Sequence, residues 1–430
     1  SYGDRYIAGD IIGTALDLDA GTITFYRNGT TQGTAFTSLP SVEYYLGCSF
    51  YNSGDNFDIN FDQRPFAYTP PTGYKKLNTF NLPDSTIKDG SEYFDTALYT
   101  GSGAAQSITS LEFSPDFVWV KNRSHNGGDP YYGVHLLFDT IRGVGNRLMS
   151  SATDSEAFSS QSLTSFTSNG FNVGTDNSIS YSGDAFAGWS WRGSDSTAAS
   201  NTDGDITSTV PANTTAGFSV VRYSGNATSG ATVGHGLSSD PEVVIGKTLS
   251  TGGYNWAVYH SGLSAVSKVV YLDLTDGEST STNKFNGTAP SATVVTLGNH
   301  GTNLSGTNNQ VLYCFAPVEG YSKFDKYTGN GSADGPFVYT GFRPAYVMTK
   351  KTNSTSQWAI TDTARSTYNV AKETLEANTT STESSGTAYQ IDILSNGFKL
   401  RDSDDARNGS GDTYIYMAFA ENPFKNSNAR

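Results

Sequence analysis

Four acidic residues near the end of the chain form its best candidate for a metal site. Asp402, Asp404, Asp405 and Asp412 lie within the segment RDSDDARNGSGD. Carboxylate oxygens are hard ligands, so this cluster could bind Ca²⁺. The segment lacks the glycine that an EF-hand needs at its sixth position, and a solvated hairpin loop explains the same residues. The sequence therefore predicts either no cofactor or Ca²⁺ at these four positions.

The other reactive residue types do not form a catalytic pattern. The five histidines are scattered, without the close spacing of a zinc site: His125, His135, His235, His260 and His300. No Gly-x-Ser-x-Gly elbow and no phosphate-binding Gly-Lys-Ser/Thr loop occurs. Asp17 and Asp19 are spaced like a glucanase pair, but a turn explains them and no tryptophan flanks them. We therefore expect no enzymatic activity.

Aromatic side chains are the remaining candidates for ligand contact, because they stack on sugar rings. The five tryptophans fall mainly at strand positions, which favours core packing: Trp119, Trp189, Trp191, Trp256 and Trp358. Four tyrosines fall in predicted loops and are the candidate contact residues: Tyr131, Tyr132, Tyr254 and Tyr321.

The composition of the 430-residue chain favours an all-β protein. Glycine (46), tyrosine (26) and phenylalanine (24) are abundant, and Ser, Thr and Asn are frequent, as in short strands joined by turns. Only Val370–Asn378 suggests a helix, and it is short. The two cysteines, Cys48 and Cys314, lie on predicted strands and are expected to be separate buried thiols, as suits a reducing cytoplasm.

Charge and hydropathy exclude several classes of partner. The formal net charge is −14 and the acidic residues are dispersed, which disfavours binding to nucleic acid or to anionic membrane surfaces. No apolar run approaches the roughly 20 residues that span a bilayer. No signal peptide is visible, and the first residue is not Met.

The first 77 residues predict paired strands. GDIIGTALDLDAGTITFYRNGT alternates apolar and polar residues and contains Asn28-Gly29, a strong hairpin signal. Tyr44–Phe61 predicts two further strands. These motifs resemble the C-terminal half of a SPRY domain, which is an antiparallel β-sandwich. The resemblance implies protein or peptide binding through loops, with the first half of the sandwich lying upstream or supplied by another chain.

The rest of the chain carries one pattern three times. In each copy a proline precedes a buried strand that ends in lysine: SPDFVWVK, DPEVVIGK and RPAYVMTK. Each copy closes on an aromatic strand, DAFAGWSW, QVLYCFAP and TYIYMAFA, and two contain the hairpin signal Ser-Asn-Gly-Phe. Copies of about one hundred residues suit tandem antiparallel β-sandwiches of the jelly-roll, concanavalin-like kind.

Three lysines occupy the same position in the three copies: Lys121, Lys247 and Lys350. They could bind a ligand as cations, or they could end the strand and keep a sheet edge soluble. We prefer the second explanation.

The pattern predicts the following organisation: a partial SPRY-like sandwich at 1–78, a connector at 79–98, sandwiches at 99–192, 217–324 and 325–430, and a linker at 193–216. A SPRY-like segment followed by these repeats resembles structural proteins of tailed bacteriophages, particularly marine phage tail fibres. The resemblance implies a homo-oligomeric, trimeric tail fibre or spike component of the virion, assembled in the host cytoplasm, that contacts other virion proteins and a host surface glycan or protein. A polysaccharide-degrading tailspike enzyme and a non-viral adhesin or lectin remain alternatives.

Overall fold

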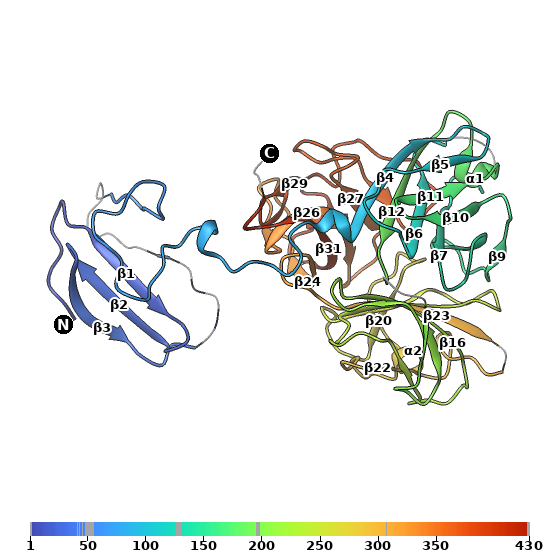
Figure 1. Ribbon diagram of the computed structural model, residues 1–430, viewed down its shortest axis with the longest axis horizontal. Helices are drawn as coiled ribbons and strands as arrows, with labels where there is room; N and C mark the ends of the chain where they lie inside the picture. The colour runs from blue at the N-terminus through green and yellow to red at the C-terminus, as the bar shows by residue number, and fades with distance from the viewer. Residues whose placement is uncertain are drawn as a thin grey trace. The chain divides into compact units, whose positions relative to one another are not determined.

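The computed structural model describes residues 2–40, 42, 44, 46–47, 56–125, 131–194, 198–306 and 308–427. The chain divides into two compact units, Ser1–Pro83 and Asp84–Arg430 (Figure 1). Antiparallel sheets dominate both units, so the all-β sandwich prediction is confirmed. Cys48 lies outside the described residues.

The N-terminal unit contains one antiparallel sheet, in the order β1-β2-β3. Its strands are β1 Ile12–Asp17, β2 Thr22–Arg27 and β3 Thr30–Phe36, and the short 3₁₀ helix η1 follows at Thr79–Asn81. Asn28 and Gly29 both have positive φ, as the predicted two-residue hairpin turn requires. Asp17 accepts the N–H of Ala20 at 2.8 Å, which is the turn role expected for it. The described residues of 44–61 form no strand, so the two strands expected there are absent from that part.

The second unit, which we call the body, contains three modules, each with one large and one small sheet. Module 1 has the large sheet β4-β12-β6-β7-β8-β9 and the small sheet β10-β11-β5. Its elements are η2 Gly90–Glu92, β4 Phe94–Thr100, β5 Gln106–Ile108, β6 Phe117–Asn122, β7 His135–Asp139, β8 Asn146–Met149, β9 Ala157–Phe158, β10 Leu163–Thr167, β11 Gly170–Val173, α1 Asn177–Ser180 and β12 Ala185–Trp191.

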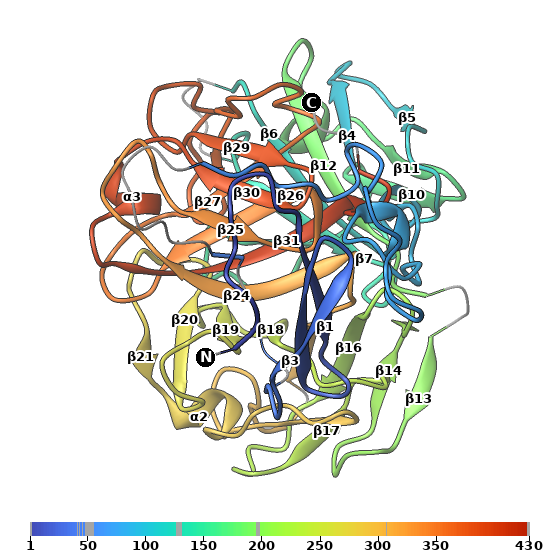
Figure 2. The same ribbon diagram turned by 90° about the vertical axis from the view of Figure 1, so that its left-hand side faces the viewer.

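Module 2 has the large sheet β13-β14-β16-β23-β18-β19-β20-β21, with β15 paired to β16, and the small sheet β17-β22. Strands β13, β14 and β16 lie side by side at one edge (Figure 2). The elements are β13 Ala199–Asn201, β14 Ser208–Val210, β15 Ala212–Asn213, β16 Phe218–Ser224, β17 Thr232–Gly234, β18 Val243–Thr248, β19 Ala257–His260, β20 Lys268–Tyr271, β21 Ser279–Thr280, α2 Thr282–Phe285, β22 Val294–Thr296 and β23 Asn309–Phe315.

Module 3 repeats the arrangement with the large sheet β24-β31-β26-β27-β28 and the small sheet β25-β30-β29. Its elements are β24 Ser322–Thr328, β25 Phe337–Tyr339, β26 Phe342–Lys351, β27 Trp358–Asp362, β28 Leu375–Glu376, β29 Ile391–Leu394, β30 Gly397–Leu400, α3 Asp405–Asn408 and β31 Thr413–Pro423. The order β4-β12-β6-β7-β8 of module 1 recurs as β16-β23-β18-β19-β20 in module 2 and β24-β31-β26-β27-β28 in module 3. The sequence pattern that occurs three times therefore builds the same sheet three times.

The Ser-Asn-Gly-Phe signals form the expected hairpins, and the glycine is needed for a close backbone approach. The turns join β10 to β11 and β29 to β30. A Cβ on Gly170 would lie 1.9 Å from the carbonyl oxygen of Ile108, and one on Gly397 would lie 2.1 Å from that of Val338. Glycine thus lets the hairpin pair with the third strand of the small sheet.

Each large sheet is buried on both faces. In β6, Phe117 and Trp119 belong to a core shared by all three modules, whereas Val118 and Val120 belong to a core inside module 1. Strands buried on both faces appear in the sequence as continuous apolar runs. The five tryptophans are at most 2% exposed, which confirms their predicted core role.

Backbone hydrogen bonds join the modules in a closed ring. Three equivalent glutamates donate their N–H groups to equivalent carbonyls of another module: Glu156 to Leu249 at 2.9 Å, Glu278 to Thr352 at 2.6 Å and Glu383 to Arg123 at 2.8 Å. Module 1 thus bonds to module 2, module 2 to module 3, and module 3 to module 1. A head-to-tail contact that is repeated between successive modules closes into a ring when the rotation from one module to the next brings the last module back to the first.

A second ring of hydrogen bonds comes from three equivalent rings at the start of β7, β19 and β27. Each ring nitrogen bonds to a backbone carbonyl of another module: Trp256 to Met149 at 2.9 Å, Trp358 to Tyr271 at 2.9 Å and His135 to Glu376 at 3.0 Å. Trp119 donates to Nδ1 of His135, so the neutral ring carries its proton on Nε2 and donates to Glu376. Burial lowers the pKa of His135, which keeps that form.

Replacing Trp256 with Phe tests one bond of this ring. Trp256→Phe is expected to lower the free energy of unfolding by about 1 kcal/mol, because the half-buried carbonyl of Met149 loses its donor. Chemical denaturation followed by circular dichroism measures the change. Phe80→Leu, at an exposed aromatic position, is the control and should leave stability unchanged. Equal stability of the Trp256→Phe and wild-type proteins would contradict the bond's role.

Three predictions of local structure are wrong. Residues 193–216 were expected to be a linker, but they contain β13, β14 and β15, because their short side chains suit edge strands of module 2. The predicted connector 79–98 contains the start of β4, where Phe94 is 1% exposed. Val370–Asn378 forms no helix, since Leu375 and Ala377 pack on the shared core and this packing overrides helix propensity.

The body is expected to fold without the N-terminal unit. A fragment of residues 84–430 should unfold in one transition, within about 2 °C of the transition of the body in the full chain, because the core clusters lie within it. Differential scanning calorimetry of both proteins makes the comparison. A fragment without a cooperative transition would mean that the body depends on residues before 84.

Candidate functional site

The three equivalent lysines are buried between strands, so the expectation that they keep an edge soluble is wrong. Lys121, Lys247 and Lys350 are each 0% exposed. Nζ of Lys121 donates to the carbonyls of Asn122 at 2.8 Å and Gly133 at 2.7 Å. A lysine stem packs easily against apolar neighbours, and the ammonium is satisfied by carbonyls in place of water.

The other two lysines follow the same rule. Lys247 donates to the carbonyl of Tyr254, and its Nζ lies 5.8 Å from the ring centroid of Trp256. Lys350 donates to the carbonyl of Thr275, in module 2, at 2.9 Å. Burial lowers the pKa of each lysine, to about 7 for Lys121 and to about 8 for Lys247 and Lys350. Since each Nζ donates to backbone carbonyls, these lysines act in the structure of the body and not as exposed ligand cations.

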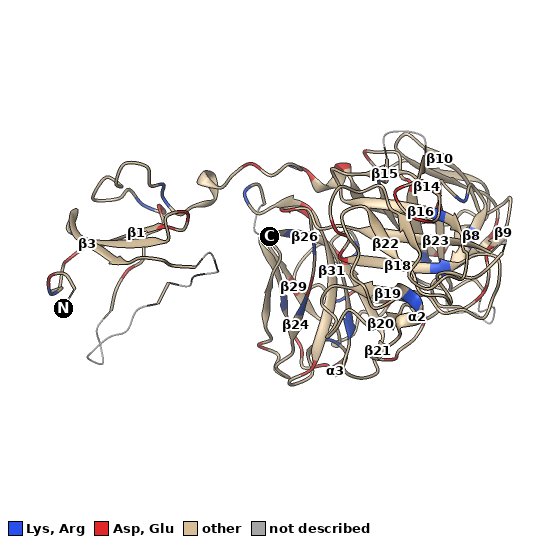
Figure 3. Ribbon diagram, turned by 90° about the horizontal axis from the view of Figure 1, so that it is seen from below, with Lys and Arg blue, Asp and Glu red and all other residues tan. Residues whose placement is uncertain are grey.

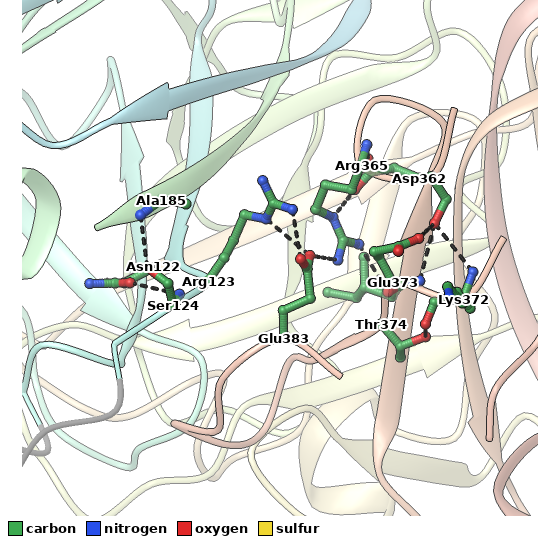
Figure 4. A network of polar contacts seen from close by, with 12 residues as sticks. Asn122, Arg123, Ser124, Ala185, Asp362, Arg365, Lys372, Glu373, Thr374 and Glu383 are labelled. Carbon is green, nitrogen blue, oxygen red and sulfur yellow. Dashed lines mark hydrogen bonds and ion pairs between the residues drawn. The ribbon is translucent and has the colours of Figure 1, made fainter. Parts of the chain in front are cut away.

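A buried ion-pair network joins module 3 to module 1 (Figure 4). Arg365 and Asp362 are both fully buried, with Nε and a carboxylate oxygen 2.6 Å apart. Trp189 of module 1 donates to the same carboxylate at 2.9 Å. Glu383 accepts from Arg365 at 2.9 Å and from Arg123 of module 1 at 2.6 Å. Each charge in the network therefore has a partner of opposite sign.

The boundary between modules 1 and 2 repeats this network. Arg142 lies 2.5 Å from Asp139 and 3.2 Å from Glu156. The hydroxyl of Tyr313, in module 2, donates to Asp139 at 2.8 Å. Glu156 thus corresponds to Glu383 of module 3, and both glutamates bind a guanidinium of their own module.

The boundary between modules 2 and 3 is different. His260 stands where the other modules have aspartate, and its Nε2 lies 3.0 Å from the carbonyl oxygen of Tyr416. Leu263 stands where they have arginine. Glu278, the equivalent glutamate, accepts hydrogen bonds only from the N–H and hydroxyl of Ser264 among the described residues. Of the three equivalent glutamates, Glu278 alone therefore has no cationic partner among the described residues.

A cavity of about 290 Å³ lies at this boundary. Its lining includes the polar residues Ser264, Glu278, Lys326, Thr328, Asn353 and Thr413. The centre of the body, by contrast, is filled by aromatic and aliphatic side chains from all three modules and leaves only about 10 Å³. The boundary between modules 2 and 3 is thus the candidate binding site that the geometry of the body indicates.

The four tyrosines predicted to contact ligand do not lie together in one site. Tyr321 is 1% exposed and packs on Phe419 in the shared core, so its predicted loop role is wrong. Tyr131 is 63% exposed. Tyr132 is half-buried against Tyr181. Tyr131 and Tyr132 remain candidates for contact at the surface.

Tyr254 is held in place by two contacts. Its carbonyl accepts from Lys247, and its ring packs edge-on against His300 at 5.1 Å. The side chain is half-buried. Tyr254 therefore remains a candidate contact residue as well, on a fixed backbone.

The acidic residues near the end of the chain do not converge on a metal site. Asp404 caps α3 by accepting from Ala406, and Asp402 accepts from the N–H of Asp404. Asp405 and Asp412 both lie 2.7 Å from Nζ of Lys351, whose ammonium occupies the place of a cation. Among the described residues, no group of three or more His, Cys, Asp or Glu side chains could hold a metal ion. The Ca²⁺ prediction is therefore not supported at these positions.

The sequence carries a signal for the buried networks. Asp139 and Arg142 occur as Asp-Thr-Ile-Arg, and Asp362 and Arg365 occur as Asp-Thr-Ala-Arg, each directly after an apolar strand. Two copies of an acid and a base three residues apart, at equivalent positions of a repeat, indicate paired charges. The third copy, His-Ser-Gly-Leu, marks the boundary that differs.

Comparison with protein families places the body. A family model described as "Domain of unknown function (DUF7483)" matches residues 89–423. The chain belongs to the DUF7483 family. The match spans all three modules of the ring.

The N-terminal unit is part of a SPRY domain, because the SPRY model matches residues 1–64. The E3 ubiquitin-protein ligase RKP of Arabidopsis thaliana is 40% identical over 80 residues, which are 18% of this chain and 6% of that protein. Ran-binding protein 10 of Danio rerio and Ran-binding protein 9 of Homo sapiens are each 36% identical over 67 residues, 16% of this chain and 11% and 9% of those proteins. These curated relatives are thus similar to this DUF7483 protein over a small part of their length.

No solved structure matches the chain. Among the described residues, no helix has the length and apolar character needed to cross a membrane.

Proposed function

We propose that this chain is a non-catalytic structural and binding protein, a tail fibre or spike component of a tailed bacteriophage. The body would serve as a rigid part of the appendage, and its surface and the SPRY segment would make the contacts. These contacts would be with other virion proteins and with a host surface glycan or protein. The chain would reach the virion after assembly in the host cytoplasm.

The observation that carries the proposal is the closed ring of three modules. Buried charges such as Asp362 and Arg365 are used in contacts between or within modules. A ring closed by buried contacts of this kind resists deformation, which suits a structural role. Lys and Arg, blue in Figure 3, are distributed over several strands of the chain.

The SPRY segment is the part that we propose to contact another protein. Its sheet exposes apolar side chains, among them Ile12, Leu16 and Phe36. Exposed apolar groups gathered on one small sheet favour contact with a protein surface. The named relatives include a ubiquitin ligase and Ran-binding proteins, and SPRY domains in such proteins suggest protein contact only in general.

Electron microscopy tests the proposal directly. An antibody raised against residues 84–430 should label particles of a tailed phage from the source of this sequence at a fixed place on the virion. The SPRY segment, residues 1–83, serves as a second epitope that should label the same place. Particles that carry no label with either antibody, while the soluble protein is recognised, would overturn the virion assignment.

The alternative of a polysaccharide-degrading tailspike enzyme has its own readout. Incubation of the protein with host capsule or lipopolysaccharide should leave chain length unchanged on gel filtration. A commercial depolymerase serves as the positive control. Shortened chains would replace the structural proposal with the enzymatic one.

A measurement of molecular mass tests the proposed oligomeric state. The ring is complete in one chain, so an oligomer would form through other surfaces than the boundaries between modules. We keep the predicted homotrimer as part of the proposal. Mass photometry of the 45.9-kDa chain should give a species of three chains, and a single-chain mass would remove the trimer.

A further inference from the structure

The three boundaries between modules differ at one chemical group. In modules 1 and 3, an arginine three residues after the strand-end aspartate binds the equivalent glutamate of the same module. The distance is 3.2 Å between Arg142 and Glu156 and 2.9 Å between Arg365 and Glu383. In module 2 that arginine is Leu263, which is 6% exposed and belongs to the shared core. Module 2 still has the equivalent glutamate, Glu278, but no arginine guanidinium of the same module binds it.

Glu278 is held in place for binding although its intramolecular partner is absent. Its own N–H donates to the carbonyl of Thr352 in module 3, and its carboxylate accepts the N–H of Ser264 at 2.9 Å as well as the Ser264 hydroxyl. The backbone of β21 begins directly after it. A carboxylate fixed by such bonds loses little freedom when it accepts a further donor.

The cavity of about 290 Å³ lies beside this carboxylate. Thr328, Asn353 and Thr413 line it beside Glu278, and Lys326 provides the positive charge. Lys326 lies on β24 and forms no ion pair among the described residues. The cavity therefore presents one negative and one positive side chain, both without a charged partner.

We propose that this cavity binds a small zwitterionic ligand that carries a guanidinium and a carboxylate, such as a free arginine or the C-terminal arginine of a peptide. The guanidinium would bind Glu278, as Arg142 binds Glu156 and Arg365 binds Glu383. The carboxylate of the ligand would bind Lys326. A guanidinium matches a carboxylate with two parallel hydrogen bonds, which favours it over an ammonium.

Both charges of the ligand are needed for the match. A ligand with only a positive charge would be attracted by Glu278 but repelled by Lys326. A ligand with only a negative charge would be attracted by Lys326 but repelled by Glu278. The polar residues that line the cavity would form hydrogen bonds with the remainder of the ligand. Binding at this cavity is separate from the contacts proposed for the appendage, so either can hold without the other.

Isothermal titration calorimetry of the full chain with four probes tests the proposal. L-Arginine carries both the guanidinium and the carboxylate, and agmatine lacks the carboxylate. L-Citrulline has a neutral urea in place of the guanidinium. A tripeptide with a C-terminal arginine represents the peptide source. L-Arginine should bind at least about tenfold more tightly than L-citrulline and than agmatine. Equal affinity for L-arginine and L-citrulline, or no binding of any probe, would overturn the proposal.

Comparison of L-arginine with the tripeptide separates the two sources of the ligand. Tighter binding of the tripeptide identifies a chain terminus as the ligand. Tighter binding of L-arginine identifies the free amino acid. Both results support the shared chemistry.

Three variants locate the site. Glu278→Gln should weaken L-arginine at least about tenfold, because the amide cannot bind the guanidinium as a carboxylate does. Lys326→Met should weaken L-arginine and strengthen agmatine, since it removes both the attraction to the carboxylate and the repulsion of the cation. Glu112→Gln, at an exposed glutamate of module 1, is the matched control and should bind like wild type.

The variants also distinguish loss of binding from loss of fold. Lys326 is exposed, so Lys326→Met should retain the wild-type circular dichroism spectrum and melting temperature. The opposite responses of L-arginine and agmatine in this variant cannot come from a general loss of structure. Unchanged affinities for both probes in Lys326→Met, or wild-type L-arginine binding in Glu278→Gln, would place any binding elsewhere and overturn the assignment.

Discussion

Asp362→Ala is expected to lower the free energy of unfolding by about 3 to 5 kcal/mol, the range for breaking a buried ion pair from one side. The carboxylate accepts from Arg365 Nε at 2.6 Å, from the Arg365 N–H at 2.9 Å and from Trp189 Nε1 at 2.9 Å. Its removal leaves Nε of the buried Arg365 guanidinium and the indole N–H of Trp189 without their acceptor, and Glu383 remains the only carboxylate bound to that guanidinium. Because Trp189 belongs to module 1, the substitution also weakens the closure of the ring.

Guanidinium chloride unfolding of residues 84–430, followed by circular dichroism, measures this loss. Asp334→Ala is the matched control, since it removes an aspartate that pairs with Lys399 on the surface of the same module. The control should unfold at the wild-type denaturant concentration. If Asp362→Ala lost less than about 1 kcal/mol, the buried network would contribute little and the ring would depend on apolar packing alone.

The strands and the threefold repeat could be predicted from the sequence because they are local. The proline before a buried strand, the terminal lysine and the closing aromatic strand recur at matching positions, and strand pairing follows from their alternation. The two Ser-Asn-Gly-Phe hairpins also formed as predicted. In each case the residues that decide the structure are neighbours in the chain.

The ring could not be predicted, because its contacts join residues that are far apart in sequence. Lys121 lies at the end of a strand, and from its neighbours alone it suggests an exposed edge. It is buried because Gly133 supplies a carbonyl and Thr380 of module 3 closes over it. The alternation within β6 gives two apolar faces but does not say that the second face meets other modules.

The candidate site was missed for a related reason. Glu278 has no unusual neighbours in sequence, and Leu263 looks like any core residue. The motif His-Ser-Gly-Leu marks the missing arginine in the sequence, but only the superposition of the three modules shows that Glu278 is the glutamate left without it. By contrast, the conspicuous run of aspartates at 402–412 serves the cap of α3 and the charge of Lys351. Local acidity was thus a weaker indicator than a break in the repeat.

The free energy of unfolding of the body is expected to increase from pH 7.5 to pH 9.5. Burial lowers the pKa of Lys121 to about 7 and that of Lys247 and Lys350 to about 8, against 10.5 for the lysine model value. In this pH range the unfolded lysine keeps its proton and the folded lysine releases it. The unfolded state then binds more protons, so stability rises with pH by up to about 1.4 kcal/mol per pH unit for each lysine.

The rise ends where buried tyrosines begin to act in the opposite direction. Burial raises the pKa of Tyr321 and Tyr346, so above pH 10 these groups lose protons only in the unfolded state, and stability falls. Urea unfolding in steps of half a pH unit should therefore show a maximum between about pH 9 and 10. Below about pH 6 the lysine contribution is constant, because the three lysines are then protonated in both states.

Lysine variants test whether the buried lysines cause the increase of the free energy of unfolding with pH. Lys121→Met should lower the slope between pH 7.5 and 9.5 by about one proton, because the group that titrates is gone. Lys372→Met, at an exposed lysine of module 3, should keep the wild-type slope. A wild-type slope in Lys121→Met would mean that the ammonium stays charged in the folded body. The carbonyls of Asn122 and Gly133 would then stabilise the charge by as much as burial destabilises it.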